Sequence, residues 1–420
     1  MRLRARIING FETRFLSTGK DTCHGTVAMH VIFVNYGDFE GPSGIHIFHL
    51  ANALVSLGVK CTAVVPGCAE GADQFGSPRF STYSISTAHR LLPPEDRQVI
   101  HAWTPRETTR TMTEQLRRRL GGIPYIVHLE DDEESILNAY LGSGSQLRGL
   151  WRRFRLRFGR PKRPLPCPGR YRRFIERADA MTLIAEGLKG CVPHPLPHLI
   201  FHPACEEEVF KLPLDADQVL RRKLAISPED IVITYPGNTH AANRQDVLGL
   251  YEAVWILRSR GRKVRFIRIG KDHVHFSNPF PALLADAYRY LPNVPSRKIP
   301  DYLAAADILV QPGAAGVYND HRFPSKLPMF LASARAVVSG NGAWVDGLSD
   351  GRNAVIVREP TPATLADAID ELIKDPEKRR QIGQNGREYA RARFSWLENA
   401  RRLSDFYTSV FTHRRIQIRS

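Results

Sequence analysis

The sequence predicts an α/β protein of two doubly wound domains that face each other across a cleft. A chain of 420 residues, 43% hydrophobic and 24% charged, has the composition of a globular protein but is too long for one ordinary core. Short apolar strand patterns alternate with helical patterns in two separate series, which indicates two mostly parallel sheets covered on both faces. Residues 190–215, rich in proline and histidine, divide the two series and are typical of a linker.

The first series defines an N-terminal domain at residues 29–205. Residues 1–28 show no clear period, and Met29 directly precedes the first strand pattern, so we expect 1–28 to be a flexible or mis-assigned extension. A glycine-containing turn at 41–44 and an apolar helical face then follow. The strands expected in this domain are 30–36, 61–65, 98–101, 125–128 and 180–184.

The second series defines a C-terminal domain at residues 206–395, followed by a helix and basic tail at 396–420. A helix is expected at about 246–259. The strands expected here are 231–235, 264–269, 308–310 and 336–338. Open sheets of this kind bind ligands beyond the carboxyl ends of their strands, so the site should lie there.

The stretch 323–338 joins a charged loop to a short helix and a buried strand. Ser325 can cap this helix, and Pro328 falls in its first turn, where a missing N–H costs nothing. Arg322 and Lys326 add cations at the same end, which predicts a site for an anion such as a diphosphate. The alternative is an ordinary surface turn before a core helix.

The formal net charge of +16 is concentrated in a few segments. Residues 148–173 hold eleven arginines and lysines and no acid, and smaller surpluses lie in 1–28 and in the C-terminal tail, so the remaining body is nearly neutral. This distribution argues against a broad nucleic-acid surface. Because Trp151, Phe154 and Phe158 are interleaved with the arginines, the segment 148–173 is either a peripheral contact to an anionic membrane or a solvated insertion.

Other classes of protein leave no signature in the sequence. No apolar run reaches the roughly 20 residues of a membrane span, and the first residues lack a signal-peptide core, so a cytoplasmic location is expected. The six cysteines show no C-x-x-C spacing, which argues against a zinc site or a disulfide scaffold. The acidic run 130–134 is interpreted as a solvated face or a helix N-terminal turn, and no metal is expected.

Four ordered blocks together resemble a known enzyme family. They are 303–312, 324–338, 347–357 and 365–396, the last ending in Arg-Phe-Ser-Trp. They are similar to the retaining glycosyltransferases of family 4, which have two Rossmann-like domains in the B fold. The segment 41–46 resembles the glycine-rich first loop of the same enzymes.

The resemblance implies a transferase that moves a sugar from a nucleotide-sugar donor, held mainly by the second domain, to a glycan or lipid-linked acceptor held mainly by the first. The nucleotide-sugar is a substrate, and the resemblance implies no cofactor and no metal. It also implies that the helix beginning near residue 396 returns to the first domain. The transfer requires stabilisation of the departing diphosphate, orientation of the sugar and exclusion of water.

The resemblance also assigns roles to residues of the first domain. Gly44 should approach the donor phosphates, and His128, at the end of a strand, matches a histidine that contacts the sugar near the reacting carbon. His46 and His101 are expected in the acceptor cleft. A histidine with only a structural role is the alternative for His128.

In the second domain the sequence departs from the family pattern. His321 and Met329 stand where many relatives have two glutamates, so the carboxylate that binds ribose is missing at Met329. Asn238 and Asn243 replace the usual cationic phosphate ligands. We expect Arg244, Arg322 and Lys326, with Ser325, to bind the phosphates instead. The departures also leave open a non-catalytic protein that binds sugar nucleotides.

Overall fold

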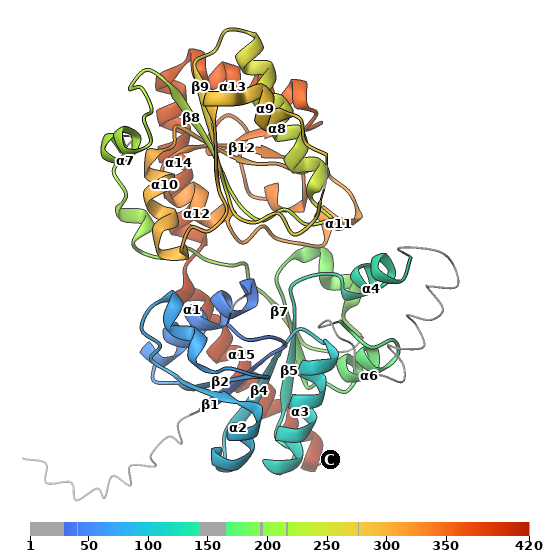
Figure 1. Ribbon diagram of the computed structural model, residues 1–420. Coiled ribbons are helices and arrows are strands. Elements are labelled where there is room, and N and C mark those ends of the chain that lie inside the picture. Colours follow the sequence, from blue (N-terminus) through green and yellow to red (C-terminus); the bar gives the residue numbers. More distant parts are fainter. Residues whose placement is uncertain are drawn as a thin grey trace, which may run out of the picture.

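The computed structural model of the protein describes residues 29–39, 41–142, 165–193, 196–215, 217–275 and 277–419. The extension 1–28 and residues 148–164 of the basic segment lie outside this part. Two α/β domains stand end to end and are connected twice, by the linker after the first sheet and by the start of the last helix (Figure 1). Among the helices of the described ranges, none combines the length and apolar character that a membrane span requires.

The N-terminal domain is built on a seven-stranded parallel sheet in the order β3-β2-β1-β4-β5-β6-β7. Its strands are β1 (His30–Asn35), β2 (Lys60–Val65), β3 (Ser81–Ser84), β4 (Gln98–Trp103), β5 (Tyr125–Leu129), β6 (Ala180–Leu183) and β7 (His198–Ile200). Its helices are α1 (Pro42–Ser56), α2 (Ile85–Leu91), α3 (Glu107–Arg119), α4 (Glu133–Gly142) and α6 (Arg170–Glu176), with short 3₁₀ turns η1 (Glu70–Phe75) and η2 (Glu186–Cys191).

The C-terminal domain is built on a six-stranded parallel sheet in the order β10-β9-β8-β11-β12-β13. The strands are β8 (Ile231–Pro236), β9 (Val264–Ile269), β10 (Tyr288–Leu291), β11 (Ile308–Gln311), β12 (Ala336–Gly340) and β13 (Val355–Val357). The helices are α7 (Gln218–Lys223), α8 (Arg244–Ser259), α9 (Phe280–Leu284), α10 (Ile299–Ala305), α11 (Val317–Asp320), α12 (Leu327–Ala332), α13 (Pro362–Lys374) and α14 (Pro376–Arg393). Helices α8, α9 and α13 cover one face of the sheet, and α10, α12 and α14 cover the other (Figure 1).

The central strands form because most of their side chains, on both faces of the sheet, are apolar. Every residue of β1, β4 and β5 is buried, as a parallel sheet between two helical layers requires. The predicted two-domain α/β architecture is therefore confirmed. The stretch 190–215, predicted as a linker, differs in one respect, because its residues 198–200 form the edge strand β7.

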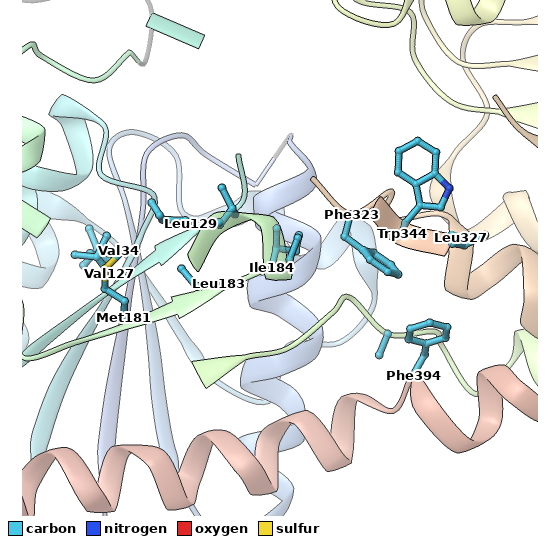
Figure 2. Packing of buried hydrophobic residues seen from close by; sticks show 14 of the residues in the cluster. Val34, Val127, Leu129, Met181, Leu183, Ile184, Phe323, Leu327, Trp344 and Phe394 are labelled. Carbon is cyan, nitrogen blue, oxygen red and sulfur yellow. The ribbon is translucent and has the colours of Figure 1, made fainter. Parts of the chain in front are cut away.

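The two domains share a hydrophobic cluster where they meet. Figure 2 shows Ile184 of the first domain beside Phe323 of the second, with Phe394 next to them, and all three belong to one buried cluster. The His202 ring stacks on Phe323 with centroids 4.4 Å apart. The backbone at Gly187, in η2, lies so close to the carbonyl of Asp320 that a side chain there would collide with it. The domains are thus in direct contact on this side.

The last helix, α15 (Trp396–Arg419), packs against α1 of the first domain. Its Tyr407 hydroxyl is hydrogen-bonded to Nδ1 of His101 at 2.7 Å, and Nδ2 of Asn399 donates to the carbonyl of His202 at 2.8 Å. Since α14 belongs to the second domain, the chain from α14 to α15 connects the two domains.

The linker is held to the second domain by one buried arginine. Arg335, which is 4% exposed, donates to the carbonyls of Pro213 (2.9 Å), Leu214 and Asp215 (3.0 Å) in the linker. It also donates to the carbonyl of Ala304 in α10 at 2.9 Å. A single planar guanidinium thereby fixes the linker against the end of a core helix.

We expect Arg335→Met to lower the free energy of unfolding by about 3 kcal/mol or more, because each buried acceptor left without a donor costs roughly 1–3 kcal/mol. Urea denaturation followed by circular dichroism measures this. Arg352→Met, at an exposed position, is the control and should change stability by less than about 0.5 kcal/mol. Equal midpoints for the two variants would contradict the proposed role of Arg335.

Candidate functional site

The carboxyl ends of the two sheets face each other where the domains meet, and we call this region the domain junction (Figure 1). Electrostatic interactions cross it: Asp131, after β5 of the first domain, interacts with Arg322 of the second, and Asp132 interacts with His321. This is the place where ligands bind in open parallel α/β sheets.

Glu130, the first residue beyond β5, is the most strongly held side chain on the first-domain side. Nε1 of Trp103 donates to its Oε1 at 2.8 Å, Nδ1 of His46 lies 2.8 Å from the same oxygen, and the hydroxyl of Ser43 donates to Oε2. Burial would raise the pKa of this carboxyl group, but the hydrogen bond and electrostatic interaction with His46, together with His128 and Ser43, lower it to about 2. Glu130 is therefore a fixed negative charge.

His128 lies inside the sheet and not at the junction surface. Its ring is fully buried, 4.0 Å from the ring of Trp103 and 5.3 Å from that of Phe201, and Nδ1 is 2.8 Å from the Thr182 hydroxyl. Burial lowers its pKa to about 3, so the imidazole is neutral. Within the described residues Nε2 has no hydrogen-bond partner. The role predicted for His128 stays a prediction, and Glu130, two residues further along the chain, is the first side chain beyond the end of the strand.

His101 and His46 also differ from the expectation of a cleft wall. His101 is fully buried, and its two ring nitrogens are hydrogen-bonded to Tyr407 and to Thr182, which makes it a link between β4, β6 and α15. His46 lies on the first turns of α1, is 6% exposed, and orients Glu130. Gly44 allows α1 to approach its own preceding loop, since a Cβ would lie 3.0 Å from the Cα of Phe39.

The acidic run 130–134 is not the uniformly solvated face that the sequence suggested. Glu133 is 3% exposed and paired with Arg106 at 3.1 Å, whereas Asp132 accepts the backbone N–H of Glu134 and so sits at the start of α4. The alternative of a helix N-terminal turn holds for Glu133 and Glu134, the first residues of α4, and for Asp132 directly before them. Within the described part of the chain, no cluster of His, Cys, Asp or Glu side chains is arranged to hold a metal ion.

The titration of Asp131 should make the stability of the protein depend on pH. Burial and the negative charges of Glu133 and Glu130 raise its pKa to about 7, against the opposing charges of Arg106 and Arg322. Because this pKa lies above the unfolded value of about 4, the folded state binds the proton more tightly, and stability falls as pH rises from about 4 to about 7.

We therefore expect Asp131→Asn to lose less stability than the wild type over that range, measured as the melting temperature from pH 4 to pH 8. Asp132→Asn is the matched control. Hydrogen bonds from Ser135 and Glu134 hold the pKa of Asp132 below its ordinary value, although burial opposes this shift. The stability that Asp132 contributes is therefore lost as pH falls, which is opposite to the pH dependence caused by Asp131. Parallel curves for Asp131→Asn and the wild type would contradict the prediction.

The loop after β8 is shaped by its two asparagines. Oδ1 of Asn238 accepts the backbone N–H of Lys271 at 2.8 Å, and Nδ2 of Asn243 donates to the carbonyl of Asn238 at 3.0 Å. Oδ1 of Asn243 accepts the N–H of His240 at 2.7 Å. These amides close the loop and join it to the loop after β9. Gly237, at the start of the loop, leaves room for the Lys326 ammonium, with which a side chain there would collide.

Three cations converge on this loop. Arg268 of β9 is fully buried; its guanidinium donates to the Thr239 hydroxyl at 2.7 Å and to Asp272 at 3.1 Å. The Lys326 ammonium lies 3.3 Å from the hydroxyl of Tyr235, whose ring is also 5.2 Å from the Arg268 guanidinium. Burial lowers the pKa of Lys326, the Tyr235 hydroxyl opposes this shift, and the charges of Arg322 and Arg268 lower it further. Arg268 is not among the cations that the sequence predicted for this region.

Arg322 completes this group, which we call the cation cluster: Arg268, Arg322 and Lys326. Its Nε donates to Asn319 at 2.9 Å, and its guanidinium lies 4.3 Å from the ring centre of Tyr318. Within the described residues Arg322 has no carboxylate at ion-pair distance, and Asp272 pairs only with Arg268. Asp131 and Asp246 also interact electrostatically with Arg322, beyond ion-pair distance. Among the described residues, Arg322 and Lys326 are thus two cations without a carboxylate at ion-pair distance, which suits an anion.

The other residues that were predicted to bind the nucleotide-sugar lie at the edges of the cation cluster. Helix α12 begins at Leu327 with Lys326 in the N-cap position and no side-chain cap, so the expectation that Ser325 caps the helix is wrong; Ser325 is exposed in the loop before it. Arg244 is the first residue of α8 and is exposed. Met329 is half-buried and packs against the shared hydrophobic cluster.

Comparison with known proteins agrees with this arrangement. Residues 230–375 match the family described as "Glycosyl transferases group 1". A D-inositol 3-phosphate glycosyltransferase of Streptomyces avermitilis is 23% identical over 257 residues, 58% of this chain and 52% of that protein. An alpha-maltose-1-phosphate synthase of Mycolicibacterium smegmatis is 32% identical over 123 residues, 28% of this chain and 31% of that protein. The chain thus spans about half, or less, of the length of these curated relatives.

Two solved structures share the whole architecture. The sucrose-phosphate synthase of Thermosynechococcus elongatus superposes with a TM-score of 0.66 at 14% identity, covering 92% of this chain and 100% of that one. HepE of Anabaena, in complex with UDP and glucose, gives a TM-score of 0.65 at 14% identity, covering 91% of this chain and 100% of that one. The chain therefore has the glycosyltransferase B fold, and residues 230–375 of its second domain are similar to the glycosyl transferases group 1 family.

Proposed function

We propose that the protein is a retaining glycosyltransferase that transfers a sugar from a nucleotide-sugar donor to a glycan or lipid-linked acceptor. The observation that carries this proposal is the cation cluster at the carboxyl ends of β8 and β9, whose positive charge suits a diphosphate. The complexes of HepE with UDP and with UDP-glucose support it, because that protein has the same fold.

The cation cluster would stabilise the leaving group. Breaking the bond between the sugar and the diphosphate increases negative charge on the nucleotide, and cations that are already fixed in place stabilise that charge without reorganisation. Lys326 and Arg322 are the two members able to contact the phosphates directly. Arg268 is fully buried and acts from behind the loop, by its charge and by fixing Thr239.

Glu130 would act on the other charge that develops. Glycosyl transfer passes through a transition state in which the sugar ring carries positive charge near the anomeric carbon. A carboxylate that stays ionised at the opposite side of the junction stabilises that charge. Glu130 meets this requirement, since three donors from α1 and β4 hold its carboxylate in place.

A second candidate function is binding of sugar nucleotides without transfer. It is favoured by Met329, which offers no strong acceptor to a ribose, and by the use of both Asn238 and Asn243 within their own loop. Incubation with UDP-, GDP-, ADP- and dTDP-sugars separates the two functions. A glycosyltransferase should be stabilised against heat by one donor and should hydrolyse it slowly, whereas the second function predicts stabilisation alone. No stabilisation by any of these nucleotides would contradict both.

The basic segment could place the acceptor site at an anionic membrane. Residues 148–164 lie outside the described part, and the described arginines Arg170 and Arg172 are ion-paired with Glu107 and Glu134. Replacing the arginines and lysines of 148–163 by glutamine should therefore remove sedimentation with phosphatidylserine vesicles while α6 stays intact. The control is the same assay with neutral phosphatidylcholine vesicles. Unchanged sedimentation of the glutamine variant would identify the segment as a solvated insertion only.

A further inference from the structure

The C-terminal domain has a second hollow, outside the domain junction, with a volume of about 500 Å³. It lies between the middle of α8, the edge strand β10 and the loop that leads from β9 to α9. Tyrosines form its floor: Tyr251 of α8 and Tyr288 and Tyr290 of β10. Asp272, His275 and Asn278 of the loop form part of its polar rim.

The hollow is separate from the cation cluster but close to it. Arg244 begins α8 directly after residues 237–243, which we call the phosphate loop, and Tyr251 lies seven residues later, roughly 10 Å further along the helix axis. The two regions are connected by His273 on the rim, whose ring stacks on His240 of the phosphate loop with centroids 4.7 Å apart and an interplanar angle of 2°. No residue of the cation cluster lines the hollow.

The floor presents aromatic rings that are fixed in position. The hydroxyls of Tyr251 and Tyr288 are hydrogen-bonded to each other at 2.7 Å, and the rings of Tyr288 and Tyr290 are stacked, with an interplanar angle of 11°. Tyr290 is 36% exposed. Two large apolar side chains of the neighbouring helices are exposed as well, namely Trp255 (39%) on α8 and Leu283 (56%) on α9. An aromatic surface that remains open in this way is typical of a binding site.

The rim carries groups that can bind hydroxyls. The Asp272 carboxylate is 31% exposed and offers acceptors, although one oxygen also receives a hydrogen bond from Arg268. Oδ1 of Asn278 accepts the N–H of Phe280 at 3.2 Å, and within the described residues its amide nitrogen donates to no other group. The imidazoles of His273 and His275 add a donor and an acceptor each.

The charge of the hollow selects among ligands. Among the described residues neither lysine nor arginine lines it, and the Asp272 carboxylate is ion-paired with Arg268 behind it, so the lining presents no free cation to a phosphate. A purely apolar ligand would leave Asp272 and Asn278 without partners. A sugar ring suits both the aromatic and the polar groups of the hollow, because its C–H face packs on an aromatic side chain while its hydroxyls bond to carboxylate, amide and imidazole groups. We propose that this hollow is a carbohydrate-binding site, distinct from the donor site, that holds a sugar unit of a glycan.

Saturation-transfer difference NMR on the full chain tests this proposal. The probes are glucose, mannose, galactose, N-acetylglucosamine and maltotetraose at millimolar concentration, each with and without saturating UDP. At least one sugar should receive saturation from the protein in both conditions. The absence of transfer to every probe would overturn the proposal, and so would a signal that UDP removes, because that signal would come from the donor site.

Two variants of Tyr290 locate the signal. Tyr290→Ala removes the exposed ring and should weaken binding by roughly tenfold, the order expected when one aromatic contact is lost. Tyr290→Phe keeps the ring and should bind as the wild type does. Thermal unfolding of both shows whether they are folded. Equal binding by Tyr290→Ala and Tyr290→Phe would overturn the assignment, whether or not the protein binds nucleotides.

Discussion

The double variant R322E/K326E is expected to lose nucleotide binding. Each of the two side chains can make charge-assisted hydrogen bonds to a diphosphate, worth roughly 1.5–3 kcal/mol each. Their loss alone weakens binding by at least about 100-fold, and the new negative charges add repulsion next to Arg268 and Tyr235. Titration calorimetry with UDP, GDP, ADP and dTDP measures the effect on the nucleotide that the wild type binds.

The fold should survive this change, because Arg322 contacts only loop and helix side chains at the junction and Lys326 contacts Tyr235. K263E/R352E is the matched control: both residues are exposed and precede strands β9 and β13, at the opposite end of the sheet from the junction. The control should bind as the wild type does. If R322E/K326E kept full affinity, the cation cluster would not be the phosphate site.

The central strands of both sheets could be predicted from the sequence, and the edge strands could not. Strands such as β4 and β11 are buried throughout and mostly apolar because helices cover both their faces, and this produces a strong signal. The edge strands β3, β7 and β10 are short and partly exposed, so their sequences resemble loops. They pair only because a neighbouring strand offers free backbone groups, which is a property of the tertiary structure.

The proposed donor site could be predicted from the sequence where its residues are close together in the chain. Arg322 and Lys326 lie in one charged loop before a helix, and local pattern sufficed to find them. Arg268 occupies a strand whose other residues are mostly apolar, and its importance follows from Thr239 and Asp272, which the fold brings beneath the phosphate loop. A charged residue in the middle of a buried strand was the signal that could have identified it.

In the first domain His128 stays a prediction, and the structure adds Glu130, two positions further along the chain, as a candidate that the sequence did not single out. Histidine is the more reactive side chain, and His128 ends the strand pattern, whereas Glu130 stands among five adjacent acids that sequence alone does not distinguish. Which of them is fixed at the junction depends on Ser43, His46 and Trp103, from two other elements. The family resemblance pointed to a histidine, so it could not identify a glutamate as the side chain fixed at the junction.

Glu130→Gln is expected to reduce the rate of sugar transfer, or of slow donor hydrolysis, by roughly 100- to 1,000-fold, the effect of removing one fixed electrostatic contact to a transition state. The amide has no charge to stabilise the sugar ring. Donor affinity should stay unchanged, because the cation cluster belongs to the other domain. Since the pKa of Glu130 is about 2, its ionisation should not contribute to the pH profile above about pH 4.

Two further variants distinguish chemistry from structure. Glu134→Gln alters a half-exposed carboxylate on the same segment, paired with Arg172 at the surface, and should keep the wild-type rate within about twofold. Glu130→Asp retains the charge and should recover part of the rate that Glu130→Gln loses, whereas a purely structural role would make the shorter side chain at least as damaging. Comparison of melting temperatures shows whether Glu130→Gln is folded. A folded Glu130→Gln variant with wild-type turnover would exclude Glu130 from catalysis, because no loss of structure could then conceal its role.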